Sequence, residues 1–339
     1  QKVLRELACA AASVDAGVAK IEVSDAESAL ATVKTLTRDF HENYLTIACD
    51  YLECGAYEEA LAALRLCDED WAMLDYYAGY IQALSGDEAA SKASFEKAAA
   101  DSTDWVFPNK LEDILVLEKD VALNPTDGHA YYYLGNLYYD KMIYDEAITD
   151  WEKAAELCPD FATVWRNLSL AYYNKQDDPV KAKMAMDRAY ALSPSDPRIF
   201  LEHDQLEKKL DTPTAERLKN YEANVSVFTQ RDDLMVEYAT LLNLRGKFRE
   251  FIMANRFHPW EGGEGKITTQ YTYALIGLAL QEMKQQHWSQ AQELLLRTQH
   301  YPENLGEGKL EGTKDNHVNY YLGLCAEALG DEAAAKAYF

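Results

Sequence analysis

The sequence has few of the residues that interrupt helices. Its 339 residues include 16 glycines and 9 prolines, and we find no window that alternates apolar and polar residues as a β-strand does. The longest apolar run near the start, residues 7–18, contains Asp15 and follows Glu6, a pattern that fits neither a signal peptide nor a membrane-spanning helix. We therefore expect an all-α chain with no membrane partner.

Positive charge is also scarce. Lys and Arg number 33 against 57 Asp and Glu, which gives a formal net charge of −24. Such a surface repels phosphate backbones, so we expect no nucleic-acid partner; it permits a basic protein partner, although scattered carboxylates can equally serve solubility. The six cysteines form no zinc-binding or disulfide pattern, and we expect none of the seven histidines to have a ligand partner at helical spacing. We therefore expect no metal and no cofactor. Buried reduced thiols favour a cytoplasmic location, but the compartment stays open.

What the sequence does contain is a repeat. Residues 128–159 carry an ordered set of small, aromatic and terminating residues at the spacing of a tetratricopeptide (TPR) unit: Tyr131, Leu134, Gly135, Tyr138, Ala147, Trp151, Ala154 and Pro159. The next unit, with one residue inserted before Ala182, repeats the set as Trp165, Leu168, Tyr172, Ala182, Met186, Ala189 and Pro194. Small residues let antiparallel helices approach closely, aromatic residues fill the space between pairs, and proline ends the second helix.

These patterns predict one right-handed TPR superhelix, an α-solenoid of antiparallel helix pairs, over residues 1–339. We expect atypical first helices in 1–41, two helix pairs in 42–99, the best-matching units in 111–194, degenerate repeats in 195–257, and two further pairs in 258–339. Between these, residues 101–110 form a break, in which we expect Trp105, Phe107 and Pro108 to pack on the preceding pair. Tyr320–Phe339 aligns without gaps on Tyr76–Phe95. Because Phe339 falls in mid-pattern, we expect a fragment of a longer protein.

A duplicated loop is the first candidate site. Residues 259–266 and 302–309 share the pattern Pro-x-x-x-Gly-Glu-Gly-Lys, each just ahead of a helix pair. Glycines on both sides can hold the central carboxylate in a fixed direction. The candidate binding residues of this face are Arg256, Trp260, Glu261, Glu264, Lys266, Glu307 and Lys309. With a flat indole, carboxylate acceptors and nearby donors, such a face suits a polyhydroxylated ligand or a peptide.

Two other interpretations of these loops stay open. In the structural one, Glu264 and Glu307 cap the helices that follow them and pair with Lys266 and Lys309. In the enzymatic one, Glu264 and Glu307 are the acid and base of a glycan-acting enzyme, as pairs of carboxylates are in glycoside hydrolysis. We expect that this chain is more a binding module than an enzyme, and that no residue is catalytic unless this alternative holds.

The second candidate site is the groove lined by the first helices of the two best units. Its inward positions are Tyr132, Asn136, Tyr139, Arg166, Tyr173 and Asn174, of which we single out Tyr132, Asn136, Arg166 and Asn174 as binding residues. Amide and guanidinium donors can hold an extended peptide backbone or a terminal carboxylate. Tyrosines at helical spacing can instead serve only the packing between repeats.

Several longer strings carry a resemblance to a known family. Residues 107–112, 132–140, 165–168 and 231–234 and both Gly-Glu-Gly-Lys loops resemble the C-terminal helical half of large bacterial TPR proteins. The N-terminal half of that family is a β-rich, mutarotase-like domain of unknown function. Lys110 departs from the arginine of the family pattern, and the first forty residues match poorly. The resemblance implies a bacterial scaffolding module that packs on, or completes the site of, a separate β domain, with a carbohydrate connection by association.

Overall fold

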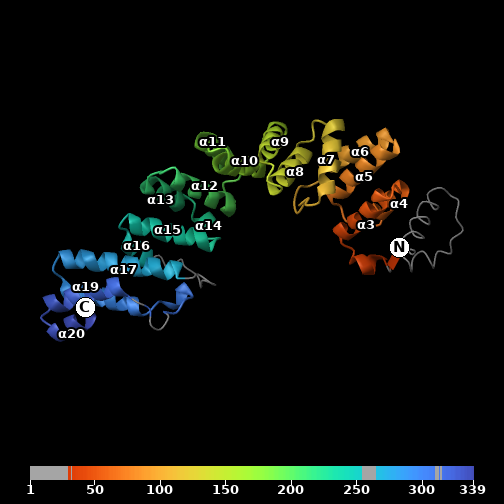
Figure 1. The fold of residues 1–339 in the computed structure, drawn as a ribbon. Helices are drawn as coiled ribbons and strands as arrows, with labels where there is room; N and C mark the ends of the chain where they lie inside the picture. The colour runs from red at the N-terminus through yellow and green to blue at the C-terminus, as the bar shows by residue number, and fades with distance from the viewer. Residues whose placement is uncertain (1–29, 32, 254–264, 310–312, 314) are drawn as a thin grey trace. The chain divides into compact units, whose positions relative to one another are not determined.

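The computed structural model describes residues 30–253, 265–309 and 313–339, apart from residues 32 and 314. Every regular element among these residues is a helix, which confirms the prediction of an all-α solenoid (Figure 1). The chain divides into two compact units, Gln1–Leu192 and Ser193–Phe339, which we call unit 1 and unit 2 and describe separately. That the whole chain is a single right-handed superhelix stays a prediction. Among the described residues, none of the helices has the length and apolar character needed to cross a membrane.

Unit 1 is built from helical hairpins stacked in chain order (Figure 1). The hairpins are α3 with α4, α5 with α6, α8 with α9 and α10 with α11, and α7 packs between α5 and α8. The bounds are α3 His41–Glu53, α4 Tyr57–Leu64, α5 Ala72–Ser85, α6 Glu88–Ala100, α7 Leu111–Leu123, α8 Gly128–Asp140, α9 Tyr144–Leu157, α10 Ala162–Lys175 and α11 Pro179–Leu192. The two best-matching units of the sequence are therefore the hairpins α8/α9 and α10/α11.

Close contact between a glycine and an aromatic ring holds the two helices of a hairpin together. A Cβ atom at Gly79 would lie 2.6 Å from Cδ1 of Phe95, so only glycine lets α5 and α6 approach this closely. Gly323 stands in the same relation to Cε1 of Phe339, also at 2.6 Å. This shared contact confirms the gapless alignment of the two segments as one kind of hairpin.

The break after α6 differs from our expectation. Trp105 is 84% exposed and Phe107 is 66% exposed, so neither ring packs on the preceding pair; Val106 between them is buried instead. Trp105 has a φ of 62°, a left-handed conformation that reverses the chain there. The prediction for these two rings was wrong because the chain reversal places neighbouring side chains on opposite sides. Of Trp105, Val106 and Phe107, only Val106 enters the core.

Buried hydroxyl–carboxylate pairs connect α7 and α8 to the hairpin before them. Tyr77 donates to Asp113 Oδ1 at 2.7 Å, and the other oxygen of Asp113 accepts from the backbone N–H groups of Asn109 and Lys110 at the start of α7. Tyr76 donates to Asp127 Oδ2 at 2.8 Å. Asp127 also begins α8, with Oδ1 accepting from the backbone at positions 129 and 130. These bonds satisfy buried polar groups that helix packing alone would leave without partners.

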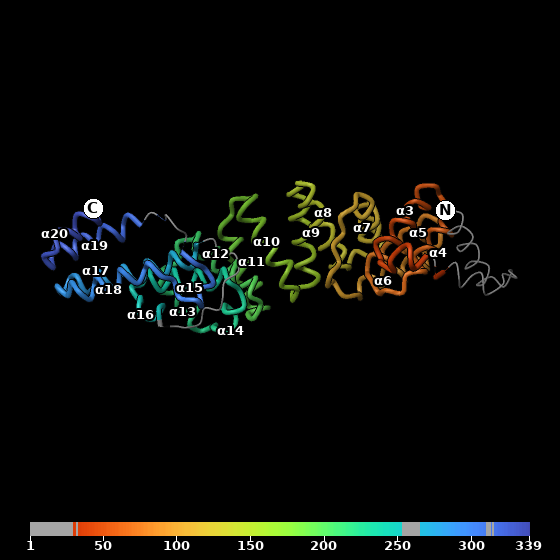
Figure 2. Tube along the Cα trace, turned by 90° about the horizontal axis from the view of Figure 1, so that it is seen from below, coloured from red at the N-terminus to blue at the C-terminus, as the bar shows by residue number. Residues whose placement is uncertain are grey.

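The helices of unit 2 vary more in length, from the 4 residues of α14 to the 19 of α17. Their bounds are α12 Pro197–Lys209, α13 Thr214–Ala223, α14 Val225–Phe228, α15 Asp232–Leu244, α16 Phe248–Met253, α17 Lys266–Lys284, α18 Trp288–Leu296, α19 Asn316–Ala328 and α20 Glu332–Tyr338, with 3-10 turns at Arg297–Gln299 and Glu303–Leu305. The hairpins α17/α18 and α19/α20 pack together, with α18 against α19, and all four helices are labelled in Figure 2. They share a core around Leu295, Val318 and Leu322.

A buried ion network holds the first part of unit 2 together. The Arg217 side chain on α13 is 4% exposed and donates to both oxygens of Asp204 on α12, at 2.9 and 2.7 Å. It also donates to Glu237 on α15 at 2.7 Å, and Tyr221 donates to Asp204 at 3.0 Å. Lys208 completes the network with Glu237 at 2.9 Å. The helices α12, α13 and α15 are thus joined through one guanidinium.

Candidate functional site

A polar pocket opens between the first helices of the two best-matching hairpins in unit 1. Its volume is about 270 Å³. The lining side chains come from α8, α9 and α10, and they are Asn136, Tyr139, Asp140, Trp151, Arg166, Asn167 and Leu170. We call this the groove pocket. It lies at the position where the sequence predicts a ligand groove, because the first helices of consecutive repeats face the same side of a TPR array.

Asn136 is the central residue of the groove pocket. Its side-chain oxygen accepts two hydrogen bonds, one from Trp151 Nε1 and one from Asn167 Nδ2, each at 3.1 Å. These bonds fix the amide plane and direct its NH₂ group, which donates to no other group in the described part of the chain. The result is a fixed, half-buried donor in the pocket wall.

Arg166 and Asn167 extend the polar wall along α10. Arg166 Nη1 donates to the side-chain oxygen of Asn167 at 3.0 Å. Asn167 is therefore held between Asn136 on one side and Arg166 on the other, so both amides are oriented before any ligand arrives. Ordering these donors in advance lowers the entropic cost of binding.

The aromatic wall of the pocket is equally fixed. The rings of Tyr139 and Trp151 lie 5.2 Å apart, and Tyr139 also contacts the ring of Tyr144 at 5.0 Å. The ammonium of Lys175 covers the outer side of this cluster, 3.9 Å from the centre of the Tyr144 ring. A pocket with rigid aromatic faces beside oriented amide donors suits a peptide backbone flanked by an apolar or aromatic side chain.

The structure separates the four groove residues singled out from the sequence. Asn136 and Arg166 line the pocket, whereas Tyr132 and Asn174 do not. Tyr132 packs on Phe161 with ring centres 4.8 Å apart, so it serves the contact between repeats. Asn174 donates to the carbonyl of Leu170 in its own helix. Of the four residues that we expected to face the groove, two therefore line the pocket and two do not.

Residues 302–309, the copy of the Gly-Glu-Gly-Lys loop that lies within the described residues, contact the start of α17 in unit 2. Glu307 accepts from the backbone N–H of Gly265 at 3.1 Å and from the hydroxyl of Thr268 at 2.8 Å. Gly265 is the N-cap residue of α17 and has a φ of 77°. Glu307 therefore places its carboxylate at the positive end of the α17 dipole, and one loop is fastened to the end of the other. The structural interpretation expected Glu307 to cap the helix that follows it; instead it caps a helix that precedes it.

Lys309 does not pair with Glu307 either. Its ammonium donates to the carbonyl of Thr298 at 3.0 Å and forms an ion pair with Asp315, the N-cap residue of α19. Lys266 is the first residue of α17. The remaining candidates of this face, Arg256, Trp260, Glu261 and Glu264, lie outside the described residues, and their role as a ligand site stays a prediction.

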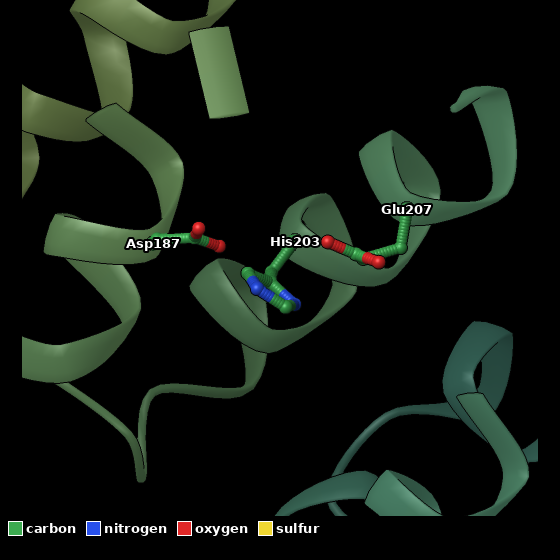
Figure 3. Close-up of side chains that lie close together, drawn as sticks. All are labelled: Asp187, His203 and Glu207. Atoms are coloured by element: carbon green, nitrogen blue, oxygen red, sulfur yellow. The ribbon is translucent and has the colours of Figure 1, made fainter. Parts of the chain in front are cut away.

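Side chains that could bind a metal lie close together in both units. His203 and Glu207 lie one turn apart on α12, contrary to our expectation that no histidine has a ligand partner at helical spacing (Figure 3). In unit 1, Asp70, Asp75 and Asp101 bring carboxylate oxygens within 4.8 Å of one another. Lys97 supplies a cation there, at 2.8 Å from Asp75, and burial beside the other two carboxylates raises the pKa of Asp101 to about 6.

Sequence reasoning missed Asn167 and the part played by Trp151 as a pocket wall. Asn167 lies 31 positions after Asn136, close to the repeat period, and this spacing is the signal that could have paired them. Trp151 was assigned to packing, and it does pack; its indole N–H also orients Asn136. A residue at a signature position can therefore shape a neighbouring site.

Comparisons with known proteins found a family profile and several solved structures to which this chain is similar. A sequence profile described as TPR repeat matches residues 144–176, so the chain contains tetratricopeptide sequence across α9 and α10. A thermophilic TPR protein of Thermus thermophilus is 18% identical, with 60% of this chain and 99% of that one covered and a TM-score of 0.34. The C-terminal part of a TPR repeat-containing protein of Cytophaga hutchinsonii is 16% identical, with 74% and 89% covered and a TM-score of 0.37. The TPR domain of P58(IPK) is 15% identical, with 100% and 82% covered and a TM-score of 0.32.

Proposed function

We propose that unit 1 is a protein-binding module whose groove pocket holds an extended segment of a partner. The observation that carries the proposal is Asn136, a residue of the pocket lining whose oxygen accepts two internal hydrogen bonds, so that its NH₂ group is the part of the amide left for a ligand. A backbone carbonyl of an extended peptide is the matching acceptor. Tyr139 and Trp151 supply faces for the side chain beside that carbonyl.

Selection of random peptides displayed on phage tests this proposal. We expect peptides that bind the whole chain, with Asn136→Ala weakening them by about tenfold or more, the loss of one well-placed hydrogen bond to a fixed donor. Asn174→Ala is the matched control, because it removes the same side chain from a position outside the pocket. Equal affinity for both variants would place the peptide elsewhere, and thermal unfolding of each variant separates lost binding from lost folding.

We further propose, on the resemblance to the large bacterial TPR proteins, that the loop face of unit 2 packs on a β-rich domain. The candidate carbohydrate connection belongs to that domain. Glu307 supports the packing interpretation rather than the enzymatic one, since both of its oxygens already accept hydrogen bonds at the start of α17. Co-expression of this chain with the β-rich domain of such a protein, followed by size-exclusion chromatography, tests the contact; separate elution of the two would argue against it.

A further inference from the structure

A second pocket lies on the other side of α8. It has a volume of about 450 Å³ and opens between α7 and α9. Leu134 and Tyr138 of α8 line it, whereas Asn136 and Asp140 of the same helix line the groove pocket. Residues two positions apart point to nearly opposite sides of a helix, so the two pockets are separate. We call this one the outer pocket.

The outer pocket has an apolar floor and a negatively charged rim. Its floor is formed by Val121 and Leu134, and its carboxylates are Glu118, Asp145, Glu146 and Asp150. No lysine, arginine or histidine lines it. Within the described part of the chain, none of its four carboxylates forms a salt bridge. The pocket therefore presents concentrated negative charge that the fold itself does not neutralise.

The effect of this crowding is visible at Asp150. Burial together with the nearby charges of Glu118 and Glu146 raises the pKa of this carboxyl to about 6. Glu118 is held in place by the hydroxyl of Tyr138, which donates to it at 2.6 Å. A cation that entered the pocket would relieve the repulsion and meet an aromatic ring beside a fixed carboxylate.

The following repeat contains a lysine at the corresponding place. There Tyr172 donates to Glu152 at 2.7 Å, which repeats the bond of Tyr138 to Glu118 with both partners shifted by one repeat. The ammonium of Lys181 lies 5.1 Å from the centre of the Tyr172 ring. The chain thus places its own lysine on this tyrosine–glutamate pair.

The first repeat lacks that lysine. With the single inserted residue counted, as the match of Ala147 to Ala182 requires, Glu146 occupies the position of Lys181. Asp145 and Asp150 likewise replace Val180 and Ala185. The same tyrosine–glutamate pair is present in both repeats, but in the first the internal cation is exchanged for additional acceptors.

We propose that the outer pocket binds a lysine side chain of a basic protein partner. The methylenes of the lysine lie on Val121 and Leu134, and its ammonium occupies the place between Tyr138 and the carboxylates that Lys181 occupies in the next repeat. The formal net charge of −24 favours approach of a basic partner over an acidic one. This site is distinct from the groove pocket and does not depend on it.

Fluorescence anisotropy with a labelled peptide of alternating lysine and serine tests the proposal. We expect saturable binding to the whole chain at low ionic strength, and a loss of about tenfold in Glu146→Lys, which supplies the missing lysine from within the chain. Glu53→Lys is the matched control, since it makes the same change of charge at an exposed residue of α3 far along the sequence. It should change the affinity by less than about twofold.

Four further outcomes test the proposal. A peptide with norleucine in place of lysine should not bind, because it keeps the methylenes and loses the ammonium. Equal weakening by Glu146→Lys and Glu53→Lys would show attraction by overall charge alone and overturn the proposal. So would an absence of saturable binding to the unmodified chain, or full retention of binding in a Glu146→Lys variant that folds normally.

Discussion

A Cβ atom placed on Gly135 would lie 2.4 Å from Cδ1 of Trp151. The indole therefore fills the space that any other residue at position 135 would need, and α8 and α9 approach to the distance this glycine allows. The relationship recurs between Gly79 and Phe95 in α5/α6, so it is a property of the hairpin rather than of one pair. It links the spacing in the sequence directly to the packing of the hairpin.

Gly135→Ala is expected to destabilise the protein by about 1–3 kcal/mol, the usual cost of forcing an extra methyl group into a packed core. This loss would exceed the small gain in helix propensity of alanine. Chemical denaturation checks it. In a Trp151→Leu background the same substitution should cost less, because the smaller side chain leaves room. Additive effects of the two substitutions would contradict the contact as the cause.

Arg217→Ala in unit 2 is expected to cost about 3–5 kcal/mol, since it leaves the buried carboxylate of Asp204 without its cation. The matched comparison is Lys208→Ala, which removes an exposed ion pair with Glu237 and should cost less than about 1 kcal/mol. Urea unfolding of both variants measures the difference. Similar losses of stability in the two variants would show that the network does not depend on the buried Arg217.

Glu307→Gln is expected to loosen the first turn of α17. The substitution removes the charge that faces the helix dipole and weakens two hydrogen bonds, at a cost of about 1 kcal/mol. Hydrogen exchange of the amides in that turn should accelerate, and Glu303→Gln, an exposed neighbour in the same loop, should leave it unchanged. Unaltered exchange in Glu307→Gln would remove the capping role.

Asp120→Asn is expected to flatten the dependence of stability on pH. Asp120 is fully buried in α7, and burial next to the carboxylate of Asp127 raises its pKa to about 9. In the unfolded chain an aspartate has a pKa of about 4, so the native state holds the proton over the range between these values. The stability from this group is therefore complete below the lower pKa and is lost as the pH rises toward the higher one.

The measurement is the free energy of unfolding from pH 5 to pH 9 for the parent and for Asp120→Asn. The parent should lose stability steadily over this range, and the variant should lose less, because asparagine carries no proton to release. Asp50→Asn, at an exposed residue of α3, is the control and should follow the parent. Parallel curves for the parent and Asp120→Asn would show that this carboxyl does not hold its proton.

The regular part of the fold could be predicted because its information is local. The small and aromatic residues of 128–159 contact one another inside one hairpin, so their spacing alone predicts α8 and α9. The exposed rings of Trp105 and Phe107 could not be predicted in this way, since they depend on one positive φ in a stretch with no repeat. The ion network of Arg217 could not be predicted from the sequence either, because its partners lie 13 positions before it and 20 after it, on other helices.

The candidate sites divide in the same way. Asn136 and Arg166 follow from helical periodicity, which places them on the inward side of α8 and α10. The outer pocket does not: Glu118 and Asp150 belong to helices on either side of α8, and only the pocket that they line together with Tyr138 makes them one site.

The sequence by itself determined the all-helical class and the hairpins that carry the repeat signature, because each of those contacts joins residues of one short segment. Tertiary structure alone decided which side chains share a cavity, which carboxylates remain without an internal cation, and that Glu307 caps a helix earlier in the chain. Those outcomes depend on the distances between separate helices, and the packing of whole hairpins, rather than the spacing of residues within one, sets these distances.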